Sequence, residues 1–200
     1  MTVKREHQTL SLFVFSYDSR MPTNLELKAT FQNLKSAEKI ARAIGAKRRG
    51  VLRQTDTYFK VARGRLKLRE MNGARAELIY YVRRDARSKR YSRYEVIPIR
   101  DATSVKRLCR ILFGQRTVIK KTRILYLYKN ARIHIDRVGR LGSYLEFEVI
   151  VEKGKKQAQW LMSQLMKEFG ISKRSIRAGS YSDLLLSKLE ERARFKKVRA

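Results

Sequence analysis

The chain has 200 residues, of which 48 are Lys or Arg and 18 are Asp or Glu, so its formal net charge is +30 although 43% of its residues are hydrophobic. Two prolines, ten glycines and apolar residues spread along the chain argue against disorder and suit one domain with a core. One cysteine excludes an intramolecular disulfide and a cysteine-cluster zinc site. The charge predicts a polyanionic partner: nucleic acid, an acidic membrane surface or a phosphate-rich small molecule.

No apolar run approaches the roughly 20 residues of a transmembrane segment. The stretch from Leu10 to Phe15 is too short for the core of a signal peptide, and no small-residue cleavage site follows it. We therefore expect a cytoplasmic protein. Residues 1–20 match no periodic template and are expected to form a poorly ordered N-terminal extension, followed by one domain over 21–190 and a basic C-terminal tail over 191–200.

From residue 22 onward, strand and helix patterns follow one another with clear turn signals. Asn33 fits the N-cap of a helix, Asn72-Gly73 is a strong hairpin signal, and Lys129-Asn130 is a weaker one. In chain order the patterns predict a strand over 22–30, a helix over 34–44, strands over 50–60, 65–71, 75–84 and 91–99, a helix over 103–113, strands over 116–128, 131–138 and 143–152, and helices over 155–169 and 181–195. Because hairpins join most neighbours, we expect mainly antiparallel β structure with peripheral α-helices.

Most of the predicted strands have one apolar face and one charged face. Side chains two positions apart share a face, so Arg65-Leu-Lys-Leu-Arg69 places three cations opposite two leucines. Six strands together carry four acids, which are Glu26, Asp136, Glu146 and Glu148, and eight cations, which are Lys28, Arg65, Lys67, Arg69, Arg83, Lys121, Arg123 and Arg132. The acids lie on the first, seventh and eighth strands, and the cations mainly on the third, fourth and sixth.

Two arrangements would explain these faces. An open sheet with a solvated charged face would explain any one strand. Six such strands together suggest a barrel whose apolar outside is covered by the helices and whose charges line a central channel. Buried charges persist only when they are paired or bind an ionic ligand. Lys and Arg from several strands suit a chain of phosphates, and the carboxylates suit Mg²⁺ or Mn²⁺, so the set predicts metal-dependent chemistry on a triphosphate.

Several short segments in this order and spacing carry a family resemblance. They are Asn24-Leu25-Glu26-Leu27-Lys28, Gln54–Phe59, Leu66–Glu70, Lys121-Thr-Arg123, Ile133–Asp136, Leu141-Gly142, Leu145–Glu148 and Ser180–Leu185. Together they resemble the CYTH proteins, or triphosphate tunnel metalloenzymes, which include class IV adenylate cyclases, thiamine triphosphatases and inorganic triphosphatases. The similarity runs from about Pro22 to Leu189.

This resemblance implies an eight-stranded antiparallel β-barrel tunnel and roles for particular residues. It implies metal ligation by Glu26, Asp136, Glu146 and Glu148, and phosphate binding by Lys28, Lys67, Arg69, Arg83, Lys121 and Arg123. We take Glu26, Lys28 and Arg123 as the candidate catalytic residues. The departure is Asn24, which replaces the first Glu of the family's Glu-x-Glu-x-Lys signature. An amide oxygen can still face a cation, but one carboxylate is lost, which weakens the case for a second metal ion.

Two reactions remain open for such a tunnel. In the cyclase version, the ribose 3′-hydroxyl of ATP attacks the α-phosphorus and pyrophosphate leaves; in the hydrolase version, water attacks the terminal phosphorus of tripolyphosphate, thiamine triphosphate or a nucleotide. The Gln54–Phe59 and Leu66–Glu70 segments look more like the cyclase branch. His134 shares a charged face with Asp136 and could carry a proton. Trp160 is expected in the core.

The proposed tunnel does not account for the composition of the chain. Its eight cations and four acids have a net charge of +4, which leaves +26 elsewhere. An alternative is therefore a nucleic-acid- or polyphosphate-binding protein without turnover, which uses a basic surface. A third is an inactive triphosphate sensor with Asn24 as the lesion. Ser180 and Tyr181 are expected to cap the last helix rather than touch substrate, and a homodimer is one option for the oligomeric state.

Overall fold

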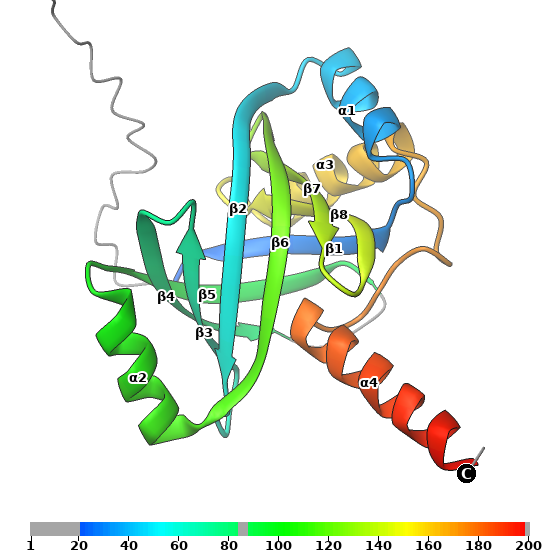
Figure 1. Ribbon diagram of the computed structural model, residues 1–200. Helices are drawn as coiled ribbons and strands as arrows, with labels where there is room; N and C mark the ends of the chain where they lie inside the picture. The colour runs from blue at the N-terminus through cyan, green and yellow to red at the C-terminus, as the bar shows by residue number, and fades with distance from the viewer. Residues whose placement is uncertain (1–20, 84–87, 199–200) are drawn as a thin grey trace, which may run out of the picture.

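The structure, a computed structural model, describes residues 21–83 and 88–198. The strands are β1 (Thr23–Thr30), β2 (Lys47–Phe59), β3 (Arg65–Met71), β4 (Arg75–Arg83), β5 (Arg90–Ile99), β6 (Gln115–Tyr128), β7 (Ala131–Val138) and β8 (Gly142–Ile150). They form one closed antiparallel barrel in the order β1-β5-β4-β3-β2-β6-β7-β8, which confirms the expected eight-stranded fold (Figure 1). The helices are α1 (Leu34–Ala43), α2 (Ala102–Phe113), α3 (Lys155–Glu168) and α4 (Tyr181–Val198).

The expected N-terminal extension, residues 1–20, lies outside the described residues, as do residues 199 and 200 of the expected basic tail. No helix in residues 21–83 and 88–198 is both long and apolar enough to cross a bilayer.

The structure places the predicted turn and cap residues at the ends of the elements, as expected. The Asn33 side chain accepts a hydrogen bond of 3.0 Å from the Ser36 backbone N–H and caps α1. Asn72 and Gly73, between β3 and β4, have φ values of 51° and 72°, and Lys129, between β6 and β7, has a φ of 52°. Positive φ values are typical of tight hairpins, so these turns join consecutive antiparallel strands.

The main hydrophobic core lies outside the barrel wall. Leu25 and Leu27 of β1, Phe147 of β8 and Met162 and Leu165 of α3 belong to one cluster and are almost fully buried. α3 packs on β1 and β8, and α1 packs on β7 and β2 (Figure 1). Burying each large apolar side chain contributes about 1.5–3 kcal/mol. Because side chains alternate along a strand, turning the leucines outward turns their charged neighbours inward.

A second, smaller hydrophobic cluster joins the barrel to α4. Its barrel members have the same parity as the charged residues and so face the interior, and α4 adds two side chains from outside. The members are Tyr58, Ile119, Val138 and Tyr144 from the strands and Tyr181 and Leu185 from α4. The Tyr144 and Tyr181 rings meet edge to face with centroids 5.2 Å apart. The first turn of α4 is thereby fixed against the charged interior.

The expectation that Trp160 belongs to the core was wrong, because its side chain is 55% exposed. The buried residues of α3 are Ala158, Leu161, Met162 and Leu165, which follow the spacing of a single helix face. Trp160 lies off that face. The element ends otherwise agree with the predictions to within three residues; the largest differences are the start of β2 at Lys47 and the end of α4 at Val198.

Candidate active site

The charged strand residues face the barrel interior, and the strand order sorts them by sign. β7, β8 and β1 are consecutive in the barrel and carry the four predicted acids, whereas β4, β3, β2 and β6 are consecutive and carry most of the predicted cations. We call the first group, Glu26, Asp136, Glu146 and Glu148, the acidic wall. We call the second group, Arg65, Lys67, Arg69, Arg83, Lys121 and Arg123, the basic wall. Two predicted cations, Lys28 and Arg132, lie on the acidic side.

Ion pairs between these groups compensate for their removal from water. Lys28 is 2% exposed, Arg123 3% and Asp136 0%. A buried charge that lacks a partner costs several kcal/mol, so such groups are found paired. Arg83 of β4 donates to Glu26 of β1, two strands away around the barrel. The interior is therefore occupied by charged side chains that satisfy one another.

Arg123 and Glu146 form the centre of this network. Arg123 donates from Nε and Nη2 to the two carboxylate oxygens of Asp136, at 2.7 and 2.6 Å, and from Nη2 to Oε2 of Glu146 at 2.7 Å. Lys28 Nζ lies 3.2 Å from Oε1 of Glu146. Burial alone would raise the pKa of Glu146, but Lys28 and Arg123 outweigh it and hold that pKa well below its usual range. Glu146 is therefore an anion at neutral pH.

Two carboxylates of the acidic wall and a histidine of β7 could hold a metal ion. His134, Glu146 and Glu148 each offer a ligand atom, and these atoms lie within 4.8 Å of one another. Burial, followed by repulsion from Arg123, lowers the pKa of His134 to about 3, so the ring is neutral and keeps a nitrogen lone pair. Its Nδ1 is buried without a hydrogen-bond partner, and so is Oδ1 of Asn24. A neutral imidazole with an unpartnered nitrogen beside two carboxylates is a donor set that fits a divalent cation.

A carboxylate that the sequence analysis missed lies among the cations of the basic wall. Asp56 of β2 is 0% exposed and takes hydrogen bonds from Arg69 at 2.8 and 3.0 Å, Lys67 at 3.3 Å and Lys121 at 3.4 Å. Burial raises the pKa of Asp56, but these three cations lower it well below its usual range. Its signal in the sequence is the alternation Gln54-Thr-Asp-Thr-Tyr58, which gives β2 a polar interior face as well.

The segment before α4 and the first turn of α4 add further contacts that the sequence did not suggest. The Tyr181 hydroxyl donates to Asp136 at 2.8 Å, and Lys28 Nζ lies 4.1 Å from the centre of its ring. Ser180 caps α4 as expected, because its Oγ accepts from the Asp183 backbone N–H at 3.3 Å. Tyr181 is the first residue of the helix rather than its cap, and its side chain reaches the interior. Arg90 of β5, also missed, donates to backbone carbonyls of residues 177 and 179.

Two predicted phosphate-binding residues lie away from the centre. Arg65 pairs with Asp183 of α4 at 2.8 Å, and Arg132 pairs with Glu148 at 2.8 Å. Along the barrel, the strand registers place Arg65 level with the start of β6 and Arg132 beside its end. The structure thus gathers Lys67, Arg69, Lys121 and Arg123 along the middle and separates Arg65 from Arg132.

Residues 23–181 match the CYTH domain, which is well over half of the chain. The chain belongs to the CYTH family. No curated protein matches it in sequence. Among solved structures, the CYTH barrel resembles the PH1012 protein of Pyrococcus horikoshii, with a TM-score of 0.73 and 21% identity, over 80% of this chain and 98% of that one.

Two further structural relatives have descriptions that mention an activity. A candidate adenylate cyclase from Vibrio parahaemolyticus has a TM-score of 0.65 and 18% identity, over 81% of this chain and 97% of that one. A candidate adenylyl cyclase from Hippeastrum, described as having a dominant triphosphatase activity, has a TM-score of 0.60 and 13% identity, over 84% of this chain and 96% of that one. At these identities the similarity establishes a shared CYTH fold.

Proposed function

We propose that this CYTH chain is a metal-dependent enzyme that cleaves a phosphoanhydride bond of a triphosphate bound inside the barrel. One observation carries the proposal: an acidic wall faces a basic wall in a buried interior. A protein that only binds polyanions gains nothing from three buried carboxylates and a fourth, partly buried one among its cations. A substrate that combines phosphates with a divalent cation gives both walls a function. The activity described for the Hippeastrum relative supports the same reading.

In this proposal the basic wall binds and orients the phosphates. Arg69 and Arg123 can each contact two oxygens, whereas Lys67 and Lys121 act as point charges. Glu146, Glu148 and His134 would hold the cation. Asp136 lies beside them, because it shares Arg123 with Glu146. A bound Mg²⁺ or Mn²⁺ would polarise phosphoryl oxygens and make an attacking water or hydroxyl more acidic.

Substrate binding must exchange partners inside the barrel, because the cations already pair with carboxylates. Arg123 bridges Asp136 and Glu146. When a phosphate draws Arg123 away, Glu146 regains free oxygen lone pairs for a cation. Phosphate and cation should therefore bind better together than apart, and by linkage each raises the affinity of the other equally.

The basic wall would bind phosphates and the candidate metal ligands would bind a cation. A metal-bound tripolyphosphate, which has no nucleoside, provides a partner for both groups. We therefore expect hydrolysis of tripolyphosphate to orthophosphate and pyrophosphate, dependent on Mn²⁺ or Mg²⁺. ATP, GTP and thiamine triphosphate should be compared in parallel, with cyclic AMP measured alongside phosphate and pyrophosphate. Cyclic AMP from ATP would identify the cyclase version of the same proposal. No turnover of any of the four by folded, metal-supplied protein would refute the enzyme proposal.

Phosphate affinity should fall as pH rises above 7. Burial, followed by repulsion from Arg69, lowers the pKa of Lys67 to about 7. Lys67 is then partly neutral in the empty protein, and phosphate binding restores its proton. Calorimetric titration of tripolyphosphate without metal, in two buffers of different ionisation enthalpy, should detect proton uptake at pH 7–8.

The free energy of unfolding of the empty protein should rise with pH, whereas phosphate affinity falls. Between about pH 7 and 10.5, the unfolded chain holds the Lys67 proton that the folded chain has lost, so this group makes stability rise with pH. Lys67→Met removes both effects and provides the comparison, since Lys28, whose pKa burial lowers to about 8, is present in both proteins. Identical proton uptake by the variant and the wild type would show that Lys67 does not carry the effect.

A further inference from the structure

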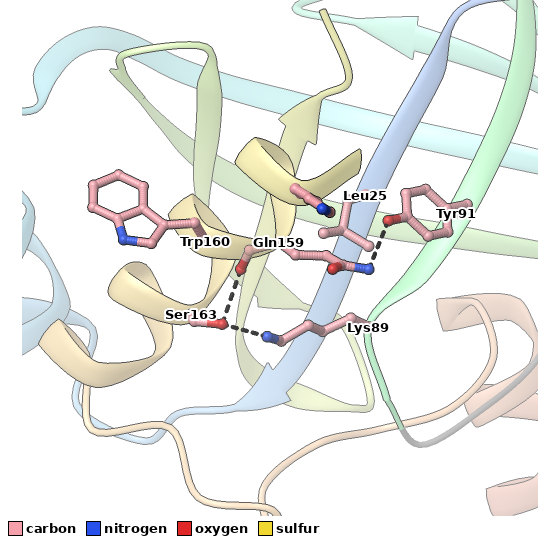
Figure 2. Close-up of a pocket in the computed structure, with 7 residues that line it drawn as sticks. Leu25, Lys89, Tyr91, Gln159, Trp160 and Ser163 are labelled. Atoms are coloured by element: carbon pink, nitrogen blue, oxygen red, sulfur yellow. Dashed lines mark hydrogen bonds between the residues drawn. The ribbon is translucent and has the colours of Figure 1, made fainter. Parts of the chain in front are cut away.

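A groove on the outside of the barrel, separate from the charged interior, combines aromatic rings with lysines. It lies between α3 and the outer face of β1 and β5, has a volume of about 590 Å³ and is lined by residues that include Lys89, Tyr91, Lys156 and Trp160. Figure 2 shows Trp160 and Tyr91 on opposite sides of the exposed turn of α3, with Gln159 between them. The Gln159 amide donates to the Tyr91 hydroxyl at 3.1 Å, which fixes the orientation of that ring.

The lysines around this groove have aromatic or hydroxyl partners. Lys129 Nζ lies 5.1 Å from the Trp160 ring centre, Lys155 Nζ lies 5.4 Å from that of Tyr91, and Lys89 donates to Ser163 at 2.5 Å. Within the part of the chain that the structure describes, none of them pairs with a carboxylate. Their charge is therefore available to an anion. We call Lys89, Tyr91, Lys129, Lys155, Lys156 and Trp160 the α3 patch.

The start of α3 independently favours an anion at the same place. Its first two residues are Lys155 and Lys156, the first turn has no acid, and the N-cap Gly154 provides no side-chain hydrogen bond. Free backbone N–H groups and the positive end of the helix dipole disfavour cations there and favour a negatively charged ligand. The lysines and the N-terminus of α3 thus both favour binding of an anion.

We infer that the α3 patch binds single-stranded nucleic acid, with bases stacked on Trp160 and Tyr91 and phosphates held by the lysines and the start of α3. The net charge supports this choice of ligand. The barrel interior, with Arg90 and Asp56 added to the predicted set, still has nine cations and five acids, so its net charge stays at +4 and +26 of the +30 lies elsewhere. Such a surplus attracts polyanions from a distance, and exposed aromatic rings then select unpaired bases.

Other polyanions fit this surface less well. A duplex hides the faces of its bases, so it could not use the rings. A membrane requires an apolar face for insertion, but the exposed residues around Trp160 on α3 are polar: Lys155, Lys156, Gln157, Gln159 and Ser163. The patch therefore lacks the apolar area that membrane binding needs.

Trp160 is the only tryptophan in the chain, so its fluorescence reports on the patch directly. We expect unlabelled oligo(dT) or oligo(U) of 15 nucleotides to quench it, and Trp160→Ala to weaken binding of the labelled oligonucleotide about tenfold by anisotropy. Phe195→Ala is the matched control, since Phe195 is 71% exposed on α4, away from the patch. Its affinity should stay within about twofold of wild type.

A charge variant tests the phosphate contacts. Lys156→Gln should reduce the slope of log affinity against log salt by about one, whereas Lys35→Gln, exposed on α1, should not change it. All four variants should turn over tripolyphosphate as wild type does. Unquenched tryptophan, wild-type affinity in Trp160→Ala, or equal affinity for duplex would each overturn the inference. So would a tryptophan response to phosphatidylserine vesicles with none to oligonucleotides.

Discussion

Glu146→Gln is expected to lower the metal-dependent turnover of tripolyphosphate by about a thousandfold or more. Glu146 lies within 4.8 Å of the other two candidate metal ligands and contacts both Lys28 and Arg123. Glutamine keeps the size of the side chain but removes the charge that attracts the cation. Loss of a metal-supplied stabilisation of about 4 kcal/mol corresponds to this factor in rate.

Separate binding measurements on Glu146→Gln distinguish weaker metal binding from weaker substrate binding. Mn²⁺ affinity, followed by calorimetry without substrate, should fall in Glu146→Gln, whereas metal-free tripolyphosphate affinity should be kept or increased because Arg123 loses a competing carboxylate. Glu95→Gln, exposed on β5, is the matched control and should match wild type in both. An unchanged rate in Glu146→Gln would remove this carboxylate from the proposed metal site.

Asp56→Asn is expected to destabilise the empty protein by about 3 kcal/mol or more, because it leaves two buried lysines and the partly buried Arg69 without their shared carboxylate. For a chain of this length, that corresponds to a fall of roughly 6–12 °C in the unfolding midpoint. Tripolyphosphate should restore much of the loss, since its oxygens replace those of Asp56. Its affinity for the variant should exceed that for wild type, because no internal anion competes with it.

Asp56→Asn should thus lower the stability of the empty protein but raise its affinity for tripolyphosphate. This combination distinguishes an internal counter-ion from a residue that contributes only packing. Asp101→Asn provides the control: Asp101 is exposed and caps α2 through the Ser104 backbone N–H, and asparagine caps as well as aspartate. Its midpoint should not move. If Asp56→Asn left the midpoint unchanged, or if ligand stabilised variant and wild type equally, Asp56 would not be competing with phosphate.

The α3 patch and the barrel interior would bind different ligands, and their affinities would depend on different interactions. Inside the barrel, charges are buried and paired, so affinity depends on exchange between partners. On the α3 patch, the lysines are solvated, so affinity depends strongly on salt. Oligonucleotide binding should therefore weaken steeply with salt under conditions in which tripolyphosphate turnover changes little.

The sequence alone determined the strands, the turns and the face of the strand on which each strand side chain lies. These are local properties: alternation has a period of two, so Leu25 and Leu27 facing a core forces Glu26 and Lys28 to the other side. The two residues Asn72-Gly73 are likewise sufficient to predict the hairpin between β3 and β4. The interior location of the predicted charges followed from such patterns, helped by a family resemblance.

The tertiary structure decided which charges meet. Arg123 reaches Glu146 only because β7 lies between β6 and β8, and Arg83 reaches Glu26 only because β5 lies between β4 and β1. Tyr181 arrives at the interior from a helix far along the chain. Contacts of this kind depend on barrel closure and on packing between distant segments, which no local period encodes. The same reason explains why Trp160 was misplaced: its hydrophobicity is local, but the face that α3 turns to the barrel is set by its neighbours.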